Sequence, residues 1–270
     1  MEHGTSQVGI WTTPTLPAGP DTPRPGAAPL WTNRGTTTAV ESKRLVSGLV
    51  KLMYAAWGDD LPRRLRDEQL HERLAAVGVR RLQLNLDDAD VAPAMRIATG
   101  ADHIGAIVTA WADSDAEVTA ALTDATDGLA GWEVDERLPI PPPEVPDGVR
   151  MDALANVAVL KRPDDLDRDE WLHRWLVDHT PIAIATQATF GYVQNVVTRQ
   201  VTEQVPRRVD ALVEELFPSA GMVDMHAFYG SGGDDAELHD RLARLMASVA
   251  RIGFDHDIDL VPGSRYVYDF

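Results

Sequence analysis

The sequence of 270 residues contains no cysteine, which excludes thiol nucleophiles, disulfides, thiolate metal sites and iron–sulfur clusters. It also lacks long apolar runs, because the longest, such as residues 154–160 and 181–185, are far too short to cross a bilayer. The N-terminus has neither a basic segment nor an unbroken apolar stretch, which argues against a secretory signal. From these absences the sequence predicts a cytoplasmic location.

Basic residues are scarce as well. The chain has 25 of them against 42 acidic residues, for a net charge of −17. A surface of this charge repels duplex DNA and anionic membranes, so the sequence predicts neither as a partner. The hydrophobic residues, 44% of the chain, suffice for one large core or two smaller ones.

Two proline-rich segments divide the chain. Residues 1–42 are rich in proline, glycine and threonine, a composition that buries too little surface to order itself, so we expect a disordered tail. Residues 141–148 contain a second proline cluster, which predicts a semi-rigid linker. The remaining residues form two units of similar size, 43–140 and 149–270.

Both units show the same order of hydrophobic patterns. In the first we expect strands over residues 49–57, 80–86, 104–112 and 132–140, with helices up to residue 77 and over 115–127. In the second we expect strands over 153–160, 192–200, 222–229 and 265–270, with helices after residue 165 and over 236–252. Residues 201–218 would be an insertion with a short extra helix. Each unit therefore follows the ferredoxin-like order βαββαβ.

A βαββαβ unit has helices on one face of its sheet and leaves the other face bare. Because a bare apolar sheet face must be covered, two such units in one chain can pack their bare faces together. The predicted fold is α+β, with two fused ferredoxin-like units that form a pseudo-dimeric α+β barrel.

The segment after residue 165 carries the most informative pattern. Trp171, Trp175 and His179 recur at intervals of four, which places two indoles and an imidazole on one helix face. Pro181 should end or kink the helix, so that His179 lies in its last turn. There the helix dipole raises the pKa of the ring and burial lowers it, which could leave a group suited to proton transfer. The same stripe is also the usual pattern of a packed core helix, and both interpretations remain open.

The second half resembles the EthD-domain family of the dimeric α+β barrel superfamily, over roughly residues 150–270. The resemblance rests on Glu170-Trp171-x3-Trp175-x3-His179-x-Pro181, followed by Tyr192-Val193-Gln194-Asn195, with Val159–Arg162, Asp167–Glu170, Asp259 and Ser264–Val267 in matching order. The first half departs from the pattern, because His71 stands alone with no tryptophan four residues before it. It looks like a degenerate copy of the unit.

The resemblance implies a function and site residues. Some members of the family and their barrel relatives act without metal or organic cofactor as decarboxylases, cyclases or oxygenases in oxidative catabolism or tailoring; for others no reaction is established. His179 would accept or donate a proton, and Trp171 and Trp175 would wall an apolar ligand. Tyr192 and Asn195 would offer hydrogen bonds, but on an ideal strand they point to opposite faces. If both reach the ligand, Tyr192 must precede the strand.

Other residues give weaker signals. His226, in the predicted strand 222–229, is a further substrate-binding candidate, although a core role is the alternative. Residues 255–259 could chelate a cation, but neighbouring side chains of an extended chain point apart, which favours a solvated loop. The sequence thus predicts neither a cofactor nor a metal.

Two functions remain as alternatives. The first is an EthD-like enzyme that acts on a hydrophobic small molecule through His179. The second is a non-catalytic binding or accessory protein that carries such a molecule or supports an oxygenase. Family members are often homodimers of one unit, so a tandem chain would contain its own dimer interface, and a homodimer of the fused chain is compatible with it.

Overall fold

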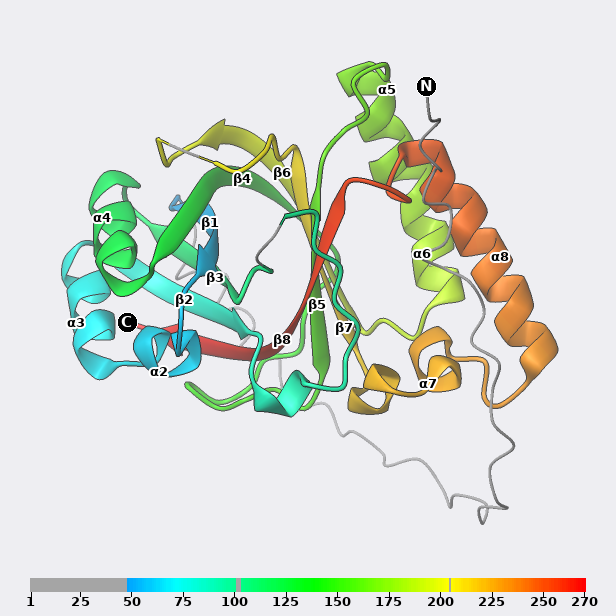
Figure 1. Cartoon of the computed structure of the whole chain (residues 1–270), viewed down its shortest axis with the longest axis horizontal. Helices are drawn as coiled ribbons and strands as arrows, with labels where there is room; N and C mark the ends of the chain where they lie inside the picture. Colours follow the sequence, from blue (N-terminus) through cyan, green and yellow to red (C-terminus); the bar gives the residue numbers. More distant parts are fainter. Residues whose placement is uncertain (1–47, 101–102, 204) are drawn as a thin grey trace, which may run out of the picture. The chain divides into compact units, whose positions relative to one another are not determined.

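The structure is a computed structural model that describes residues 48–100, 103–203 and 205–270, all of which belong to one compact unit. The predicted tail, residues 1–42, lies outside the described residues. Eight strands close into a barrel (Figure 1). They are β1 (Val50–Trp57), β2 (Val79–Leu86), β3 (Ala106–Ala112), β4 (Gly128–Ile140), β5 (Leu154–Leu160), β6 (Gly191–Gln200), β7 (Ala211–Phe217) and β8 (Ile258–Asp269).

The order of the strands shows how the barrel is built. Around the barrel it is β1-β3-β2-β8-β5-β7-β6-β4, and all neighbouring pairs are antiparallel. The first four strands of the chain thus lie in the order β4-β1-β3-β2, and the last four repeat it as β8-β5-β7-β6. Two βαββαβ units produce this repetition. The predicted α+β class and the closure of the sheet into a barrel are confirmed.

Two strand pairs join the halves. β2 pairs with β8 from Arg81 opposite Asp269 to Leu86 opposite Ser264. β4 pairs with β6 between Trp132 and Ile140, with two irregularities in register. The edge strands of the first half, β2 and β4, therefore pair with the edge strands of the second half, β8 and β6, so that none of these edges is left unpaired.

Several strands, β1 among them, are buried on both faces. In β1, Leu52 and Tyr54 belong to the cluster under the helices of the first half, whereas Met53 and Ala55 belong to the cluster inside the barrel. Such a strand needs apolar residues at nearly every position, which explains the continuous apolar runs in the sequence.

A polar network crosses the barrel interior. Arg265 Nε donates to Glu214 Oε1 at 3.0 Å, and the side-chain amides of Gln83 and Asn85 donate to the same oxygen at 2.8 and 2.9 Å. Because a charge inside a protein is stable only when it is paired and hydrogen-bonded, these four side chains act as a unit.

Helices cover the outside of the barrel (Figure 1). In the first half they are α2 (Leu61–Leu65), α3 (Glu68–Ala76) and α4 (Ala116–Ala125), with the short η1 (Ala89–Val91) after β2. In the second half they are α5 (Arg168–His173), the π-helical η2 (Arg174–His179), α6 (Thr180–Thr186), η3 (Ser219–Met222), α7 (Met225–Tyr229) and α8 (Asp235–Ile252). Asp67, Asp167 and Asp234 cap α3, α5 and α8 by accepting backbone hydrogen bonds.

Two predictions on the second half are wrong. Residues 211–217, expected as a short helix in an insertion, form the strand β7 between β5 and β6. The expected strand over 222–229 is instead the end of η3 followed by α7, whose start Asp224 caps by accepting from His226 N. The third strand of the second unit is therefore β7, and the segment after it is helical.

The predicted linker, residues 141–148, lies in the connection between β4, the last strand of the first half, and β5, the first strand of the second half. No helix among the described residues is both long and apolar enough to cross a membrane.

Candidate active site

The predicted tryptophan–histidine stripe lies on one continuous helical stretch, residues 168–186, made of α5, η2 and α6. The π-helical η2 directly precedes Pro181, and the helix continues past the proline as α6 instead of ending there. His179 consequently lies in the middle of the stretch, and its predicted position in the last turn is wrong.

The stripe is packed. Trp171 and Trp175 are fully buried with their rings 5.3 Å apart, and His179 is 6% exposed. The Phe254 ring contacts all three, with centroid distances of 6.0, 5.9 and 6.5 Å. The three side chains thus form a seam with the residue that follows the last turn of α8.

The His179 ring has a specific partner in this seam. Its Nδ1 lies 2.9 Å from Ser248 Oγ on α8, so the ring joins η2 to α8. Burial lowers the pKa of His179 to about 4, because the charged form loses its hydration. The expected opposing effect of a helix end is missing, and the ring is neutral at physiological pH.

Tyr192 and Asn195 do not share a site. Both belong to β6, three positions apart, and therefore point to opposite faces of the strand. Tyr192 lies in the helix-covered cluster of the second half, whereas Asn195 Nδ2 donates to Leu212 O and its strand neighbour Val197 packs in the barrel interior.

His226 also lies apart from the stripe, on α7. Its Nδ1 is 2.7 Å from Ser231 Oγ and its Nε2 is 3.3 Å from Asp235 Oδ1. These contacts fix the connection from α7 to α8.

The helix-covered face of β5, β7 and β6 carries a group that the sequence reasoning missed, Glu215. In register, Glu215 of β7 lies between Asn156 of β5 and Tyr192 of β6. Three buried side-chain oxygens here lack a hydrogen-bond partner: Glu215 Oε1, Asn156 Oδ1 and Gln194 Oε1. We call these four residues, Asn156, Tyr192, Gln194 and Glu215, the Glu215 cluster.

Burial shapes the acidity of the cluster. It raises the pKa of the Glu215 carboxyl to about 7, because the charged form loses its hydration. Burial, and then the Glu215 charge, raise the pKa of Tyr229 on α7 to about 12, and the same two causes raise the pKa of Tyr192. Glu215 is therefore a carboxyl that exchanges its proton near neutral pH.

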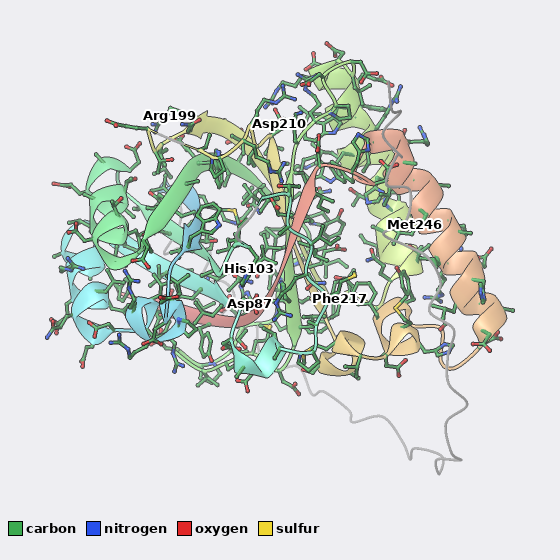
Figure 2. All side chains as sticks on the ribbon, viewed as in Figure 1. Asp87, His103, Arg199, Asp210, Phe217 and Met246 are labelled. Carbon is green, nitrogen blue, oxygen red and sulfur yellow. The ribbon has the colours of Figure 1, made fainter. Side chains whose placement is uncertain are left out.

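Solvent reaches this face despite its helical cover. Ala158 lies in the middle of β5, flanked in register by Val213 and Leu260, yet it is only half-buried, as is Glu215. On the same face, Phe217, labelled in Figure 2, stacks on Phe228 of α7 with ring centroids 4.0 Å apart. The helices thus leave part of the sheet surface accessible beside the cluster.

The sequence analysis does not identify Glu215, because it predicts a helix where the structure has the strand β7. Within ALVEELF, Glu214 and Glu215 are adjacent, and both look like the solvated side of a short amphipathic helix. As a strand, the segment sends Glu214 into the barrel and Glu215 beneath the helices.

The described part of the chain contains no group of three or more histidine, aspartate or glutamate side chains placed to hold a metal ion. Residues 255–259, the candidate chelating segment, contribute instead to ion pairs with Lys161 and Arg207.

Comparisons with known proteins complete the description. A scan of protein-family models finds no match to the chain, and a search of curated proteins finds none either. Among solved structures, the chain is similar to an anthrone oxidase-like protein, with 11% identity, coverage of 82% of this chain and 92% of that one, and a TM-score of 0.46. It is also similar to a mutant chlorite dismutase from Candidatus Nitrospira defluvii, with 12% identity, coverage of 83% and 95%, and a TM-score of 0.45. At such values these likenesses carry no argument about function, and the assignment of the fold stands on the strand order of the chain itself.

Proposed function

We propose that this chain binds a hydrophobic small molecule carrying an oxygen substituent against the helix-covered face of β5, β7 and β6, and that Glu215 exchanges a proton with that molecule. The observation that carries the proposal is the Glu215 carboxyl, whose buried Oε1 has no hydrogen-bond partner although the residue is only half-buried, and whose pKa is raised to about 7. A perturbed carboxyl in such a place is the usual mark of acid–base chemistry.

The neighbouring groups suit a phenolic or carbonyl oxygen. A neutral Glu215 donates a hydrogen bond to that oxygen, and Gln194, whose Nε2 already donates to Thr180 Oγ1 at 2.8 Å, keeps its own oxygen free. His179 serves as a positioning residue that ties η2 to α8 through Ser248. An EthD-like role without bound cofactor, in oxidative catabolism or tailoring of aromatic, polycyclic or ether compounds, is part of this proposal and rests on the resemblance of residues 150–270.

A second candidate is binding without chemistry, as in a carrier or an accessory protein of an oxygenase. The observation in its favour is the packing of His179, because the residue that the resemblance assigns to proton transfer is 6% exposed and held by Ser248. The two candidates share the pocket and differ in whether a proton moves.

Binding of 2-naphthol, followed by its fluorescence between pH 5.5 and 8.5, tests the pocket. We expect the affinity of the wild type to fall at least fivefold as Glu215 ionises, since the naphthol hydroxyl donates to Gln194 Oε1 and its oxygen then meets a carboxylate that can no longer donate. Glu215→Gln, which keeps a donor at every pH, should bind with constant affinity. Glu72→Gln, the same change at an exposed helical position, is the matched control and should behave like the wild type.

Exchange of the C1 ring hydrogen of 2-naphthol for deuterium, followed by NMR in D2O, tests the proton transfer. The enzyme candidate predicts faster exchange with the wild type and no acceleration with Glu215→Gln. Tight binding without faster exchange supports the second candidate. If the pH profile of binding is the same in Glu215→Gln and the wild type, the pocket assignment is wrong.

A further inference from the structure

A cavity opens at one mouth of the barrel, on the opposite side of the sheet from the Glu215 cluster. Its volume is about 760 Å³, within the range of small-molecule sites. Its walls come from four strands of both halves and the loops beside them, including Trp57 of β1, Trp132 of β4 and Val159 of β5. None of the site residues predicted from the sequence lines it.

The cavity has an apolar wall and an ionic wall. Ile104, Val159, Val209 and the two tryptophans form the apolar wall, and four of these five residues belong to the buried cluster of the barrel interior, with Trp57 packed against it. Lys161, Arg207, Asp257 and Asp259 form the ionic wall. An apolar wall with a few convergent polar groups is the general design of a ligand pocket.

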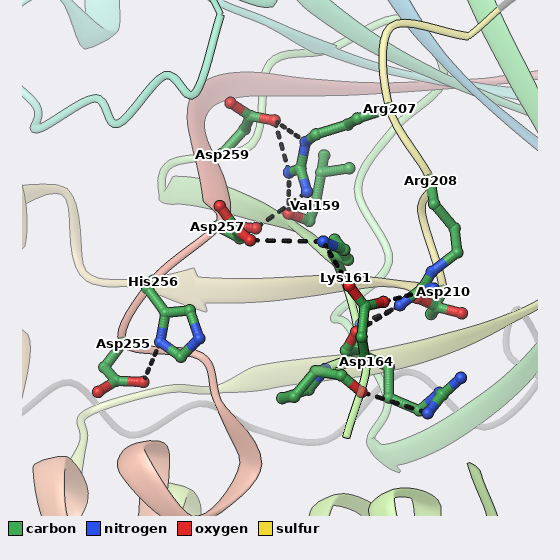
Figure 3. A network of polar contacts seen from close by, with 12 residues as sticks. Val159, Lys161, Asp164, Arg207, Arg208, Asp210, Asp255, His256, Asp257 and Asp259 are labelled. Carbon is green, nitrogen blue, oxygen red and sulfur yellow. Dashed lines mark hydrogen bonds and ion pairs between the residues drawn. The ribbon is translucent and has the colours of Figure 1, made fainter. Parts of the chain in front are cut away.

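Within the ionic wall, Arg207 and Asp259 satisfy each other. Arg207 Nη2 and Nε lie 2.6 and 3.1 Å from Asp259 Oδ2, and the guanidinium also donates to the carbonyl oxygens of Asp257 and Val159 (Figure 3). The other oxygen of Asp259 accepts from the backbone N and the hydroxyl of Thr99, at 2.6 and 2.9 Å. Four of the five N–H donors of Arg207 and both oxygens of Asp259 are thus engaged, which makes the pair a fixed part of the wall.

Lys161 is different, because its ammonium has only distant partners. Its Nζ lies 3.5 Å from Asp164 Oδ2 and 3.6 Å from Asp257 Oδ2, both beyond the usual hydrogen-bond length (Figure 3). The aspartate side chains are 69% and 59% exposed, whereas that of Lys161 is 26% exposed. Water solvates the carboxylates, while the lysine faces the cavity with donors to spare.

We infer that the barrel mouth is a second ligand site, for a flat aromatic molecule that carries one carboxylate. The ring lies against Trp57 and Trp132, and the carboxylate takes a short hydrogen-bonded ion pair with Lys161 in place of the two long ones. The Lys161 ammonium provides the positive charge for this anion, on a wall whose Arg207 and Asp259 already neutralise each other. This inference is independent of the function proposed for Glu215.

Calorimetric titration of the full chain with 2-naphthoate, and with 2-naphthamide as its neutral counterpart, tests the inference. We expect Lys161→Met to weaken the binding of 2-naphthoate at least tenfold and to change the affinity for 2-naphthamide less than twofold. Lys161→Arg keeps the charge, so its affinity for 2-naphthoate should stay within threefold of that of the wild type. In a sample with labelled indole nitrogens, the resonances of Trp57 and Trp132 should shift on binding, with Trp57→Leu and Trp132→Phe used for assignment.

Two further results separate this site from the first. Glu215→Gln should bind 2-naphthoate like the wild type, so a failure of the proposed function leaves this site standing. The inference is overturned if 2-naphthoate fails to bind, if Lys161→Met binds it with unchanged affinity, or if Glu215→Gln abolishes its binding. Far-UV circular dichroism of each variant confirms that it is folded.

Discussion

Two adjacent glutamates show how position on a strand decides the behaviour of a residue. Burial by itself would raise the pKa of Glu214, but Arg265, Asn85 and Gln83 inside the barrel hold it below the ordinary value. Glu215 points to the other face, meets no such partners, and has its pKa raised to about 7. One carboxyl is therefore a structural anion and the next is a titrating acid.

The pH dependence of stability should separate the two. Because the folded pKa of Glu215 lies above its ordinary value of 4.5, the folded state keeps a proton that the unfolded state loses between pH 4.5 and about 7. The free energy of unfolding contributed by Glu215 therefore falls with rising pH across this window. The advantage of Glu215→Gln over the wild type should grow by about 3 kcal/mol between these pH values and then level off. Urea unfolding of both proteins from pH 4 to 8 measures it, and a pH-independent difference would contradict it.

Glu214→Gln should lower the free energy of unfolding, whereas Glu215→Gln should raise it. Glu214→Gln leaves Arg265 buried without its anion, so we expect a loss of about 3 kcal/mol at pH 7. The cost should shrink as the pH falls, since protonation removes the charge of Glu214 in the wild type as well. The same urea series serves as the measurement, and equal stabilities at pH 7 would show that the network contributes nothing.

At the scale of elements, hydrophobic periodicity predicted most of the fold. Strands buried on both faces, such as β1 and β5, read as continuous apolar runs, and α8 has a clear amphipathic pattern. The predictions for the residues of β7 and α7 were wrong because each segment is short and carries charged or polar residues. In so short a segment a period of two and a period of 3.6 cannot be told apart. Tertiary pairing with β5 and β6 decides the state of β7, and local sequence does not contain that information.

The candidate site was predictable only in part. Spacing placed Trp171, Trp175 and His179 on one helix face, but whether that face borders a cavity depends on Phe254 and Ser248, which are distant in sequence. Glu215 could not be found while its strand was missing from the predicted sheet.

The cap of α8 provides a test at this scale. Asp234 accepts from the backbone N of Ala236 and Glu237, so Asp234→Ala should cost about 1 kcal/mol of stability. Asp234→Asn keeps an acceptor and should recover most of the loss. Thermal unfolding of the two variants checks this, and equal melting temperatures would contradict the capping role.

At the scale of the whole molecule, the two halves form one barrel through the pairs β2–β8 and β4–β6. A chain cut within residues 141–148 should therefore stay assembled, because both pairs and the shared interior remain. A protease site inserted there, followed by cleavage and size-exclusion chromatography under native conditions, tests this. Co-elution of the two fragments with a single unfolding transition is expected, and separate elution would show that the halves are independent domains.

The central claim is that Glu215 is an acid poised near neutral pH on the face proposed to bind a ligand. A carbon-13 NMR titration of glutamate side-chain carboxyls, with Glu215→Gln to identify the resonance, measures it directly. The account predicts a midpoint at about pH 7 that moves upward when 2-naphthol is added. A midpoint near 4.5, unchanged by 2-naphthol, would contradict it.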